Sequence, residues 1–265
     1  MTATVPAEDA LVLRQDEAGV ATLTLNRPKQ YNALSRAMLG ALLTALDAVA
    51  TDPAIRVVVI AGNGPAFCAG HDLKEIRAQD ERAFHQALFA QCGQVMLTIN
   101  RLPQPVIARV QGIATAAGCQ LVAACDLAVA AENARFATSG INVGLFCSTP
   151  GVALSRNLGR KQALELLLTG DFIDAPTALR WGLVNRVVPL EQLDSTTRQL
   201  ADAIASKSPL AIRMGKALFY EQLELNLADA YACASETMAC NLDSEDAREG
   251  IDAFIAKRKP QWKGR

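Results

Sequence analysis

Hydrophobic positions recur at two spacings along the chain, and each spacing predicts one kind of element. Apolar and polar residues alternate over Val20–Leu25, and the apolar run Leu11–Leu13 precedes this stretch across a glycine-containing turn, which predicts a β-hairpin. Arg56–Ile60 is a short apolar run and is typical of a strand buried on both faces. Val106–Val110 and Leu127–Ala130 are predicted to form two further strands.

Helical spacing appears between these strands. A first helix is expected after Ser35, a good N-cap residue, because apolar residues then recur every three or four positions. Its apolar face comprises Met38, Leu42, Leu46 and Val49. The segment Asp72-Leu-Lys-Glu75 fits a capping box that opens a second helix. Longer helices are predicted at about residues 81–100 and at residues 119–125.

The order of the elements divides the chain in two. Strands and helices alternate at short spacing up to about residue 190, which is typical of an α/β core. Beyond that point the pattern is helical only, in segments at about 191–207, 209–223, 226–241 and 245–258. We therefore predict an α/β core over residues 1–190 and a helical region over residues 191–265.

Composition and charge exclude several classes of function. The 265 residues are 51% hydrophobic and 20% charged, so a large core is expected. The 26 basic residues nearly balance 27 acidic ones, which leaves no positive field for nucleic acid or an anionic membrane. No uncharged apolar run approaches the roughly 18 residues of a membrane span, and Met1–Glu8 shows no signal or transit pattern. We expect a cytoplasmic protein with neither a nucleic-acid nor a membrane partner.

The cysteines do not predict a metal site. They form no Cys-x-x-Cys pair, so zinc and thioredoxin-like interpretations are poor, and no other metal-ligand cluster is present. Several lie in apolar runs as small core residues of a protein in a reducing compartment. The seven cysteines are at positions 68, 92, 119, 125, 147, 233 and 240.

Two loops of small residues each join a strand to a helix. The first, Gly64–Leu73, contains Gly70, where the backbone can approach a ligand closely, and the amide of His71 just ahead of the helix that Asp72 caps. The second, Val110–Gln120, has a similar run of alanines and glycine. Taken alone, each is also compatible with an ordinary turn or tight helix packing. Together, their N–H groups could form an oxyanion hole for a carbonyl that becomes enolate-like.

The pairing of these loops resembles the enoyl-CoA hydratase/isomerase (crotonase) superfamily. The motifs are Phe67-Cys-Ala-Gly-His-Asp-Leu and, farther on, Ala-Ala-Gly-Cys-Gln-Leu121, with Cys125-Asp behind them. Matches also occur near both ends of the chain, so that the resemblance covers about residues 10–260. Within the superfamily, the wording is most similar to the enoyl-CoA hydratase domain-containing protein 3 group.

The resemblance implies a fold and a ligand. The fold would be a crotonase-like spiral of ββα units whose C-terminal helices build a trimer or a dimer of trimers. The ligand would be an acyl-CoA, with coenzyme A as part of the substrate and no separate cofactor. The oxyanion amides would belong to His71 and to Ala117, where the family usually has glycine. The family's CoA positions fall on Lys29, Gln30, Tyr31, Ala69, Asp72 and Leu73, with Phe254 and Lys257 reaching the CoA of a neighbouring subunit.

The sequence departs from the family where hydration needs acids and bases. The two glutamates of the family's hydratases fall on Gln120, whose amide does not exchange protons at neutral pH, and on Gly140, which has no side chain. Losing one acid–base group costs about 10²–10⁴ in rate. We therefore do not expect efficient hydration by the standard route.

Three interpretations stay open at this stage. The first is an enzyme acting on an enoyl-CoA or another acyl-CoA, with the oxyanion hole supplying most of the catalysis. The second is a thioester hydrolase that uses Cys147 or a held water, for which His85 is a possible base; Ser148, next to Cys147, is also a good helix N-cap. The third is an acyl-CoA-binding scaffold with little chemistry.

Overall fold

Two β-sheets organise the part of the chain that the structure describes, residues 10–265 of a computed structural model. In the larger sheet the strand order is β1-β2-β3-β4-β6-β9, and all neighbours are parallel except the β1–β2 hairpin. Its strands are β1 (Val12–Glu17), β2 (Val20–Leu25), β3 (Val57–Gly62), β4 (Val106–Val110), β6 (Leu127–Ala131) and β9 (Arg186–Val188). The smaller sheet contains β5 (Ile113–Thr115), β7 (Arg135–Ala137) and β8 (Ile173–Asp174), in that order.

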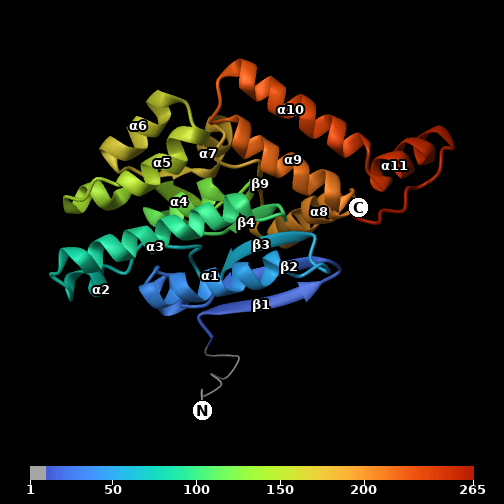
Figure 1. Cartoon of the computed structure of the whole chain (residues 1–265). Coiled ribbons are helices and arrows are strands. Elements are labelled where there is room, and N and C mark those ends of the chain that lie inside the picture. Colours follow the sequence, from blue (N-terminus) through green and yellow to red (C-terminus); the bar gives the residue numbers. More distant parts are fainter. Residues whose placement is uncertain (1–9) are drawn as a thin grey trace, which may run out of the picture.

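Helices cover the larger sheet and extend beyond it (Figure 1). The helices of the core are α1 (Arg36–Ala50), α2 (Leu73–Arg77), α3 (Arg82–Arg101), α4 (Ala117–Ala124), α5 (Ser148–Asn157), α6 (Arg160–Thr169) and α7 (Ala175–Trp181). The later helices are α8 (Leu193–Ala205), α9 (Pro209–Gln222), α10 (Leu227–Leu242) and α11 (Glu245–Ile255). Short 3₁₀ turns lie at Pro28–Gln30, Ser139–Val143 and Leu190–Gln192.

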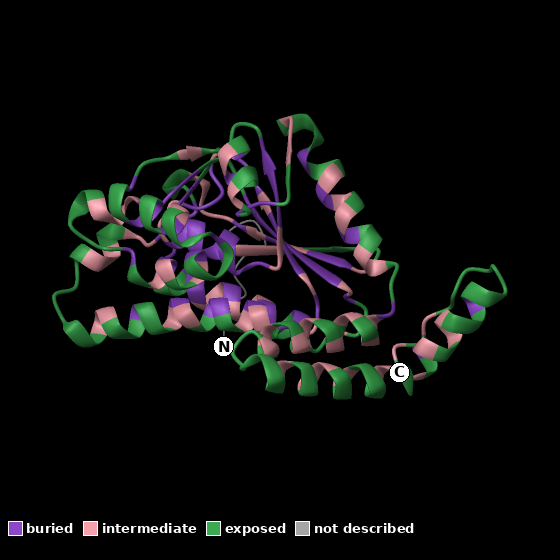
Figure 2. Cartoon of the chain, turned by 90° about the horizontal axis from the view of Figure 1, so that it is seen from above, coloured by how far each residue is buried: buried purple, intermediate pink, exposed green. Residues whose placement is uncertain are grey.

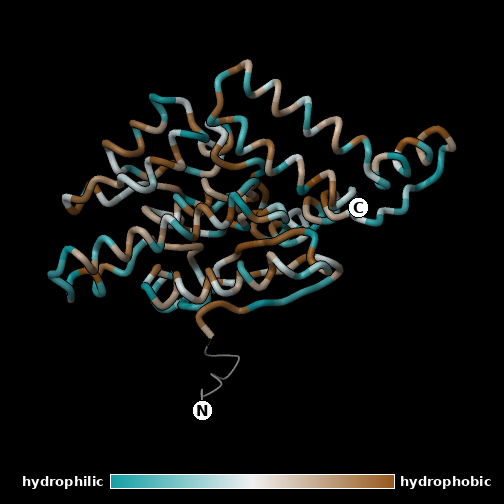
Figure 3. Tube along the Cα trace, viewed as in Figure 1, coloured by the Kyte–Doolittle hydropathy of each residue, from teal (hydrophilic) through white to brown (hydrophobic). Residues whose placement is uncertain are grey.

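The apolar pattern explains which surfaces are buried. Every residue of β3 is buried, as the continuous apolar run predicted, because α1 and α3 pack on one face of the sheet and α8 on the other. The predicted apolar face of α1 is buried in full, and Ser35 caps this helix by accepting a hydrogen bond from the amide of Met38. Figure 2 shows this buried centre in purple, surrounded by helices with exposed outer faces. Figure 3 shows the edge strand β1 as largely hydrophilic.

The helical region after residue 190 has two kinds of surroundings. α8 belongs to the core, since Leu193 and Ala201 pack with Val59 and Ile107 of the sheet. α9, α10 and α11 project from the core, and none of their residues except Asp246 and Ala253 is buried (Figure 1). The predicted division at residue 190 stays a prediction.

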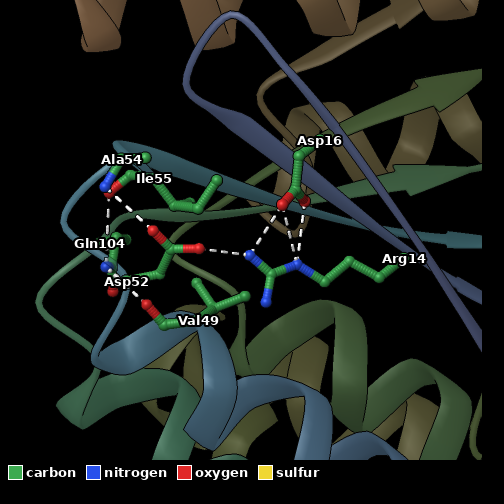
Figure 4. A network of polar contacts seen from close by, with 7 residues as sticks. All are labelled: Arg14, Asp16, Val49, Asp52, Ala54, Ile55 and Gln104. Atoms are coloured by element: carbon green, nitrogen blue, oxygen red, sulfur yellow. Dashed lines mark hydrogen bonds and ion pairs between the residues drawn. The ribbon is translucent and has the colours of Figure 1, made fainter.

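A polar network ties the first hairpin to the end of α1 (Figure 4). The guanidinium of Arg14 donates to Asp16 at 2.8 Å and to Asp52 at 2.7 Å. Gln104 donates to the carbonyl oxygen of Val49 at 2.9 Å, which satisfies a group at the C-terminal end of the helix. The network fixes the edge strand against the layer of helices.

Asp246 holds the C-terminal tail against α9 and α11. Its carboxylate is almost fully buried and accepts hydrogen bonds from the Ser208 hydroxyl at 2.6 Å and from the amides of Lys263 and Gly264 at 2.6 and 3.1 Å. Burial alone would raise the pKa of Asp246, but these hydrogen bonds outweigh burial and lower it below 3.8. The carboxylate therefore stabilises the folded tail at neutral pH.

Asp246→Asn should lower the free energy of unfolding by about 2 kcal/mol at pH 7, because an amide cannot accept all of these hydrogen bonds. A lowered folded-state pKa gives stabilisation that is complete above the unfolded pKa of 3.8 and is lost as the pH falls through the folded pKa. The difference in melting temperature between variant and wild type, measured from pH 7 down to pH 2.5, should therefore be constant above about pH 4 and should shrink as the pH falls further. A difference that stays constant across this range would contradict the assignment.

Most of the cysteines lie in the core, as their apolar surroundings in the sequence predicted. Cys68, Cys92, Cys119, Cys125 and Cys147 are buried as free thiols. Over residues 10–265 no cluster of His, Cys, Asp or Glu could hold a metal ion, and no helix is long and apolar enough to cross a membrane. The predicted lack of a signal pattern at Met1–Glu8 lies outside the described residues.

Candidate functional site

The first small-residue loop lies directly along strand β5. The amide of Cys68 donates to the carbonyl of Ile113 at 3.0 Å, and the amide of Thr115 donates back to the carbonyl of Cys68 at 3.0 Å. Gly70 follows with φ at +88°, a conformation that favours glycine. A Cβ added to Gly70 would lie 2.8 Å from the Cβ of Ala116 and 3.2 Å from the amide nitrogen of Ala117. The two predicted loops are therefore in backbone contact.

The second loop turns sharply into α4. Ala116 has φ 51° and ψ −119°, which is unusual for a residue with a side chain, and Ala117 is the first residue of the helix. A Cβ added to Gly118 would lie only 2.1 Å from the carbonyl oxygen of Cys68. Glycine is therefore required at position 118 by the close approach of the first loop, which is the tight packing that the sequence left open.

Two main-chain N–H groups at this junction have no acceptor in the described part of the chain. The amide of Ala117 belongs to the first turn of α4, where no carbonyl of the helix is available. Next to His71, the amide of Leu34 donates to the carbonyl of Gly70 and the amide of Asp72 donates to the carbonyl of Leu34. The amide of His71 takes no part in this β-bridge. Within residues 10–265, neither amide donates a hydrogen bond.

Asn32 fixes the first loop, and the sequence did not single it out. It is fully buried, and its side-chain amide donates to the carbonyls of Asn63, Ala66 and Phe67 at 2.9, 2.9 and 3.1 Å. Its Oδ1 accepts from the amide of Arg27 at 2.9 Å. A buried asparagine with these bonds sets the path of the chain toward Gly70. In the sequence, Asn32 is a polar residue in a segment without a helical or strand pattern, and nothing there indicates this role.

The predicted CoA positions of the N-terminal half lie side by side. The amide of Ala69 donates to the carbonyl of Tyr31 at 2.9 Å, which joins the segment 29–31 to the segment 69–73. Lys29, Tyr31 and Leu73 are exposed along this border. The structure brings these residues together on one surface next to the two loops.

Asp72 caps α2, as the sequence predicted, but the capping box is incomplete, because the carboxylate of Glu75 accepts from the amide of Arg36 and not from that of Asp72. Its Oδ1 accepts from the amides of Lys74 and Glu75 at 3.1 and 3.3 Å, and its Oδ2 lies 3.1 Å from the guanidinium of Arg27. Burial acts to raise the pKa of Asp72, but the hydrogen bonds from Arg27 and the two amides lower it overall. The carboxylate of Asp72 therefore stays ionised and keeps its bonds to Arg27 and to the two amides.

Gln120 is buried on α4 and faces α3. Its Oε1 accepts a weak hydrogen bond from the thiol of Cys92 at 3.9 Å. Because α4 begins at Ala117, Gln120 lies less than one turn from the free amide at the start of the helix. The side chain is thus held between α3 and the junction of the loops.

Gly140 lies against Cys147. A Cβ added to Gly140 would lie 2.7 Å from the sulfur of Cys147 and 2.7 Å from the carbonyl oxygen of Leu145. Burial raises the pKa of the Cys147 thiol, and a hydrogen bond with the Gly140 backbone offsets only part of that rise. The thiolate form of Cys147 is therefore disfavoured.

The structure differs from what the sequence predicted for Ser148 and places His85 away from the role of a base. The prediction that Ser148 N-caps a helix is wrong, because Ser148 is the first helical residue of α5 and its hydroxyl donates to the carbonyl of Phe146 at 3.3 Å. The helix can begin at Ser148 because Pro150 then falls in its first turn, where proline is tolerated. The Nε2 of His85 lies 2.9 Å from the carbonyl of Gln79, so this imidazole is held at the start of α3.

Phe254 and Lys257 are remote from the loops within one chain. Phe254 lies in the last turn of α11 and Lys257 just beyond the helix, and Figure 1 shows α11 and α2 at opposite ends of the molecule. Phe254 is 85% exposed and Lys257 has a left-handed backbone with φ 52°. One chain therefore does not bring these two residues together with the other predicted CoA positions.

The fold and the paired loops define a crotonase-like α/β protein. The Enoyl-CoA hydratase/isomerase family matches residues 15–265, and the chain belongs to this family. The crystal structure of an enoyl-CoA hydratase from Mycobacterium smegmatis is 60% identical with a TM-score of 0.93, over 95% of this chain and 98% of that one.

Curated relatives give the same family at lower identity. Enoyl-CoA hydratase domain-containing protein 3, mitochondrial, of Rattus norvegicus is 47% identical over 97% of this chain and 85% of its own length. The 2,3-dehydroadipyl-CoA hydratase of Escherichia coli K12 is 38% identical over 97% of this chain and 99% of its own length. The predicted superfamily and group are confirmed, whereas the cytoplasmic location stays a prediction.

Proposed function

We propose that the protein binds acyl-CoA thioesters and polarises the thioester carbonyl with the main-chain N–H groups of His71 and Ala117. The observation that carries this proposal is the close approach of the two loops, where a Cβ added to Gly70 would lie 3.2 Å from the amide nitrogen of Ala117, while the amides of His71 and Ala117 have no acceptor among residues 10–265. Pre-aligned N–H donors stabilise the negative charge that develops on a carbonyl oxygen, and losing one costs about 10²–10³ in rate. The chain's membership in the family supports a thioester as the ligand.

The same site is poorly equipped for adding water to an enoyl thioester. The two positions where hydratases of the family carry glutamates hold Gln120 and Gly140, neither of which exchanges protons at neutral pH. We propose that standard hydration is slow and that the oxyanion hole supplies most of any catalysis. A carboxylate at position 140 also has no space, since even a Cβ there meets the sulfur of Cys147 and the carbonyl of Leu145.

Thioester hydrolysis through Cys147 is the less favoured alternative. A cysteine nucleophile must form a thiolate, and burial raises the pKa of this thiol. The imidazole that the sequence offered as a base, His85, is bonded to the carbonyl of Gln79 instead. A binding protein without turnover is the third class, and only measured turnover separates it from an enzyme.

We propose that the CoA site is completed by a neighbouring copy in a trimer or a dimer of trimers. The helices α9, α10 and α11 expose large apolar side chains well beyond what an isolated surface usually carries. These are Phe219, Leu227, Tyr231, Met238, Leu242, Phe254 and Ile255, together with Leu223, the C-cap residue of α9. Phe254 and Lys257 would then reach the CoA held by another subunit, where a lysine ammonium suits a phosphate.

Calorimetric titration with butyryl-CoA and with its thioether analogue, S-butyl-CoA, tests the proposed function. The two ligands differ only in the carbonyl oxygen, so the thioester should bind at least about tenfold more tightly if two N–H groups hold that oxygen. Equal affinity for both ligands would exclude the oxyanion hole. Absence of binding by either would exclude the acyl-CoA site.

The hydratase positions are tested by adding the missing carboxylates in a form that fits. Gln120→Glu with Gly140→Glu alone should lower the melting temperature, because overpacking of this kind costs about 1–3 kcal/mol. Adding Cys147→Gly removes one of the two clashes and should recover part of the loss. Hydration of crotonyl-CoA, followed by its ultraviolet absorbance, should rise above the wild-type rate in the triple variant. A folded, CoA-binding triple variant without that rise would contradict the placement of these two positions.

A further inference from the structure

We propose that the imidazole of His71 accepts a hydrogen bond from a hydroxyl group on the acyl chain of the bound thioester, and that it thereby selects hydroxylated acyl groups. The inference rests on the proposed acyl-CoA site. Its basis is the ring nitrogen Nε2 of His71, which is buried and has no hydrogen-bond partner in the described part of the chain. Buried polar side-chain atoms are almost always paired, so an unpaired one at a ligand site points to a group on the ligand.

The other ring nitrogen fixes what kind of group can pair with Nε2. Nδ1 of His71 lies 3.3 Å from the carbonyl oxygen of Leu34. A carbonyl oxygen only accepts hydrogen bonds, so Nδ1 carries the proton and Nε2 carries a lone pair. Burial lowers the pKa of His71 more than the Leu34 carbonyl and the Glu75 carboxylate raise it, which keeps the ring neutral at pH 7. Nε2 is therefore an acceptor that needs a donor.

The imidazole lies where the two loops and α3 meet. Its ring packs edge-on against Phe89, with 5.3 Å between the ring centroids. Three residues farther along the same helix, Cys92 contacts the side chain of Gln120. Residues three apart on a helix are neighbours on its surface, so His71 and Gln120 lie along one side of α3. The unpaired acceptor thus belongs to the same region as the proposed oxyanion hole.

The chemistry of an acyl thioester indicates that the group donating to Nε2 of His71 is a hydroxyl. The acyl chain of a simple saturated or unsaturated thioester carries neither O–H nor N–H, and the amide N–H groups of the pantetheine arm lie on the other side of the sulfur, so such an acyl chain would leave Nε2 unpaired. The amide of the same residue, His71, is the one proposed to hold the thioester oxygen. The hydroxyl must therefore be on one of the first carbons after the carbonyl, as in a 3-hydroxyacyl thioester.

Binding of 3-hydroxybutyryl-CoA and butyryl-CoA, compared by calorimetric titration, tests the inference. A site built around a buried acceptor rejects the ligand that lacks the donor, so the wild type should bind the hydroxylated ester at least about tenfold more tightly. His71→Phe keeps the main-chain N–H and the ring against Phe89 but removes Nε2, and its ratio of affinities should fall to about 1. His71→Gln offers an amide oxygen in place of Nε2 and should retain part of the preference.

The matched control is His85→Phe, because the Nε2 of His85 is already bonded to the carbonyl of Gln79. This variant should keep the wild-type ratio. A wild-type ratio near 1, or a preference that survives His71→Phe, would overturn the inference while leaving acyl-CoA binding intact. Failure of both esters to bind would instead overturn the proposed function. If His71→Phe does not fold, the wild-type ratio and His71→Gln decide the question.

Discussion

Ala117→Pro is expected to reduce turnover of any thioester that the wild type consumes by about 10²–10³. Proline lacks the N–H, and its ring carbons would occupy the space in front of the amide nitrogen. The first position of a helix tolerates proline, because its N–H has no helical acceptor in any case. The change therefore removes one proposed donor while the helix is kept. Stopped-flow or steady-state assays with an acyl-CoA panel measure the effect, and the thioester-over-thioether preference in binding should fall with it.

Ala116→Gly is the matched control for this experiment. Residue 116 has a positive φ that glycine adopts without strain, and the substitution leaves the N–H of residue 117 in place. Its melting temperature should equal or exceed that of the wild type, with the thioester preference retained. Because proline also restricts the residue before it, the Ala116→Gly/Ala117→Pro double variant is used if the single one melts low. A folded proline variant that still prefers the thioester would refute a role for the amide of residue 117.

Lys216→Met is expected to lower the free energy of unfolding by about 3–5 kcal/mol, the largest stability effect that the structure predicts. Only 7% of the Lys216 side chain on α9 is exposed, and its ammonium donates to Asp126 at 2.6 Å and to the carbonyls of Ile99 and Gln104 at 2.8 and 3.0 Å. The hydroxyl of Tyr220, one turn along the same helix, donates to the other carboxylate oxygen at 2.7 Å. Removing the ammonium leaves a carboxylate without its cation and removes three hydrogen bonds between α9 and the core.

Chemical denaturation of Lys216→Met, followed by circular dichroism, measures this effect. Lys161→Met on the exposed surface of α6 is the control and should change stability by less than about 0.5 kcal/mol. Asp126→Asn combined with Lys216→Met should be less destabilising than the sum of the two single changes, because the partners act on each other. A Lys216→Met variant as stable as the control would show that the buried pair does not hold α9.

The sequence predicted those features that depend on neighbouring residues. The hairpin, the buried strand β3 and the Ser35 cap follow from spacing and from one residue type each. The two small-residue loops were also visible in the sequence as runs of glycine and alanine, as at Gly70 and Gly118, but their pairing was predicted only from the resemblance to the family. These local preferences act within a few positions along the chain.

Features that join distant segments were not predictable from pattern alone. The ion pair between Asp126 and Lys216 spans 90 positions, and nothing in either segment distinguishes it from a solvated charge. The role of Asn32 depends on three carbonyls that only the folded loop brings together. The unpaired nitrogen of His71 is likewise a property of its surroundings. Packing, which no local pattern encodes, determines all three.

A crystal structure with a bound acyl-CoA thioester tests the central claim most directly. We expect the thioester oxygen to lie about 2.7–3.1 Å from the main-chain nitrogens of both His71 and Ala117. An acyl-CoA bound with its carbonyl oxygen away from either nitrogen, or outside the junction of the two loops, would contradict this claim.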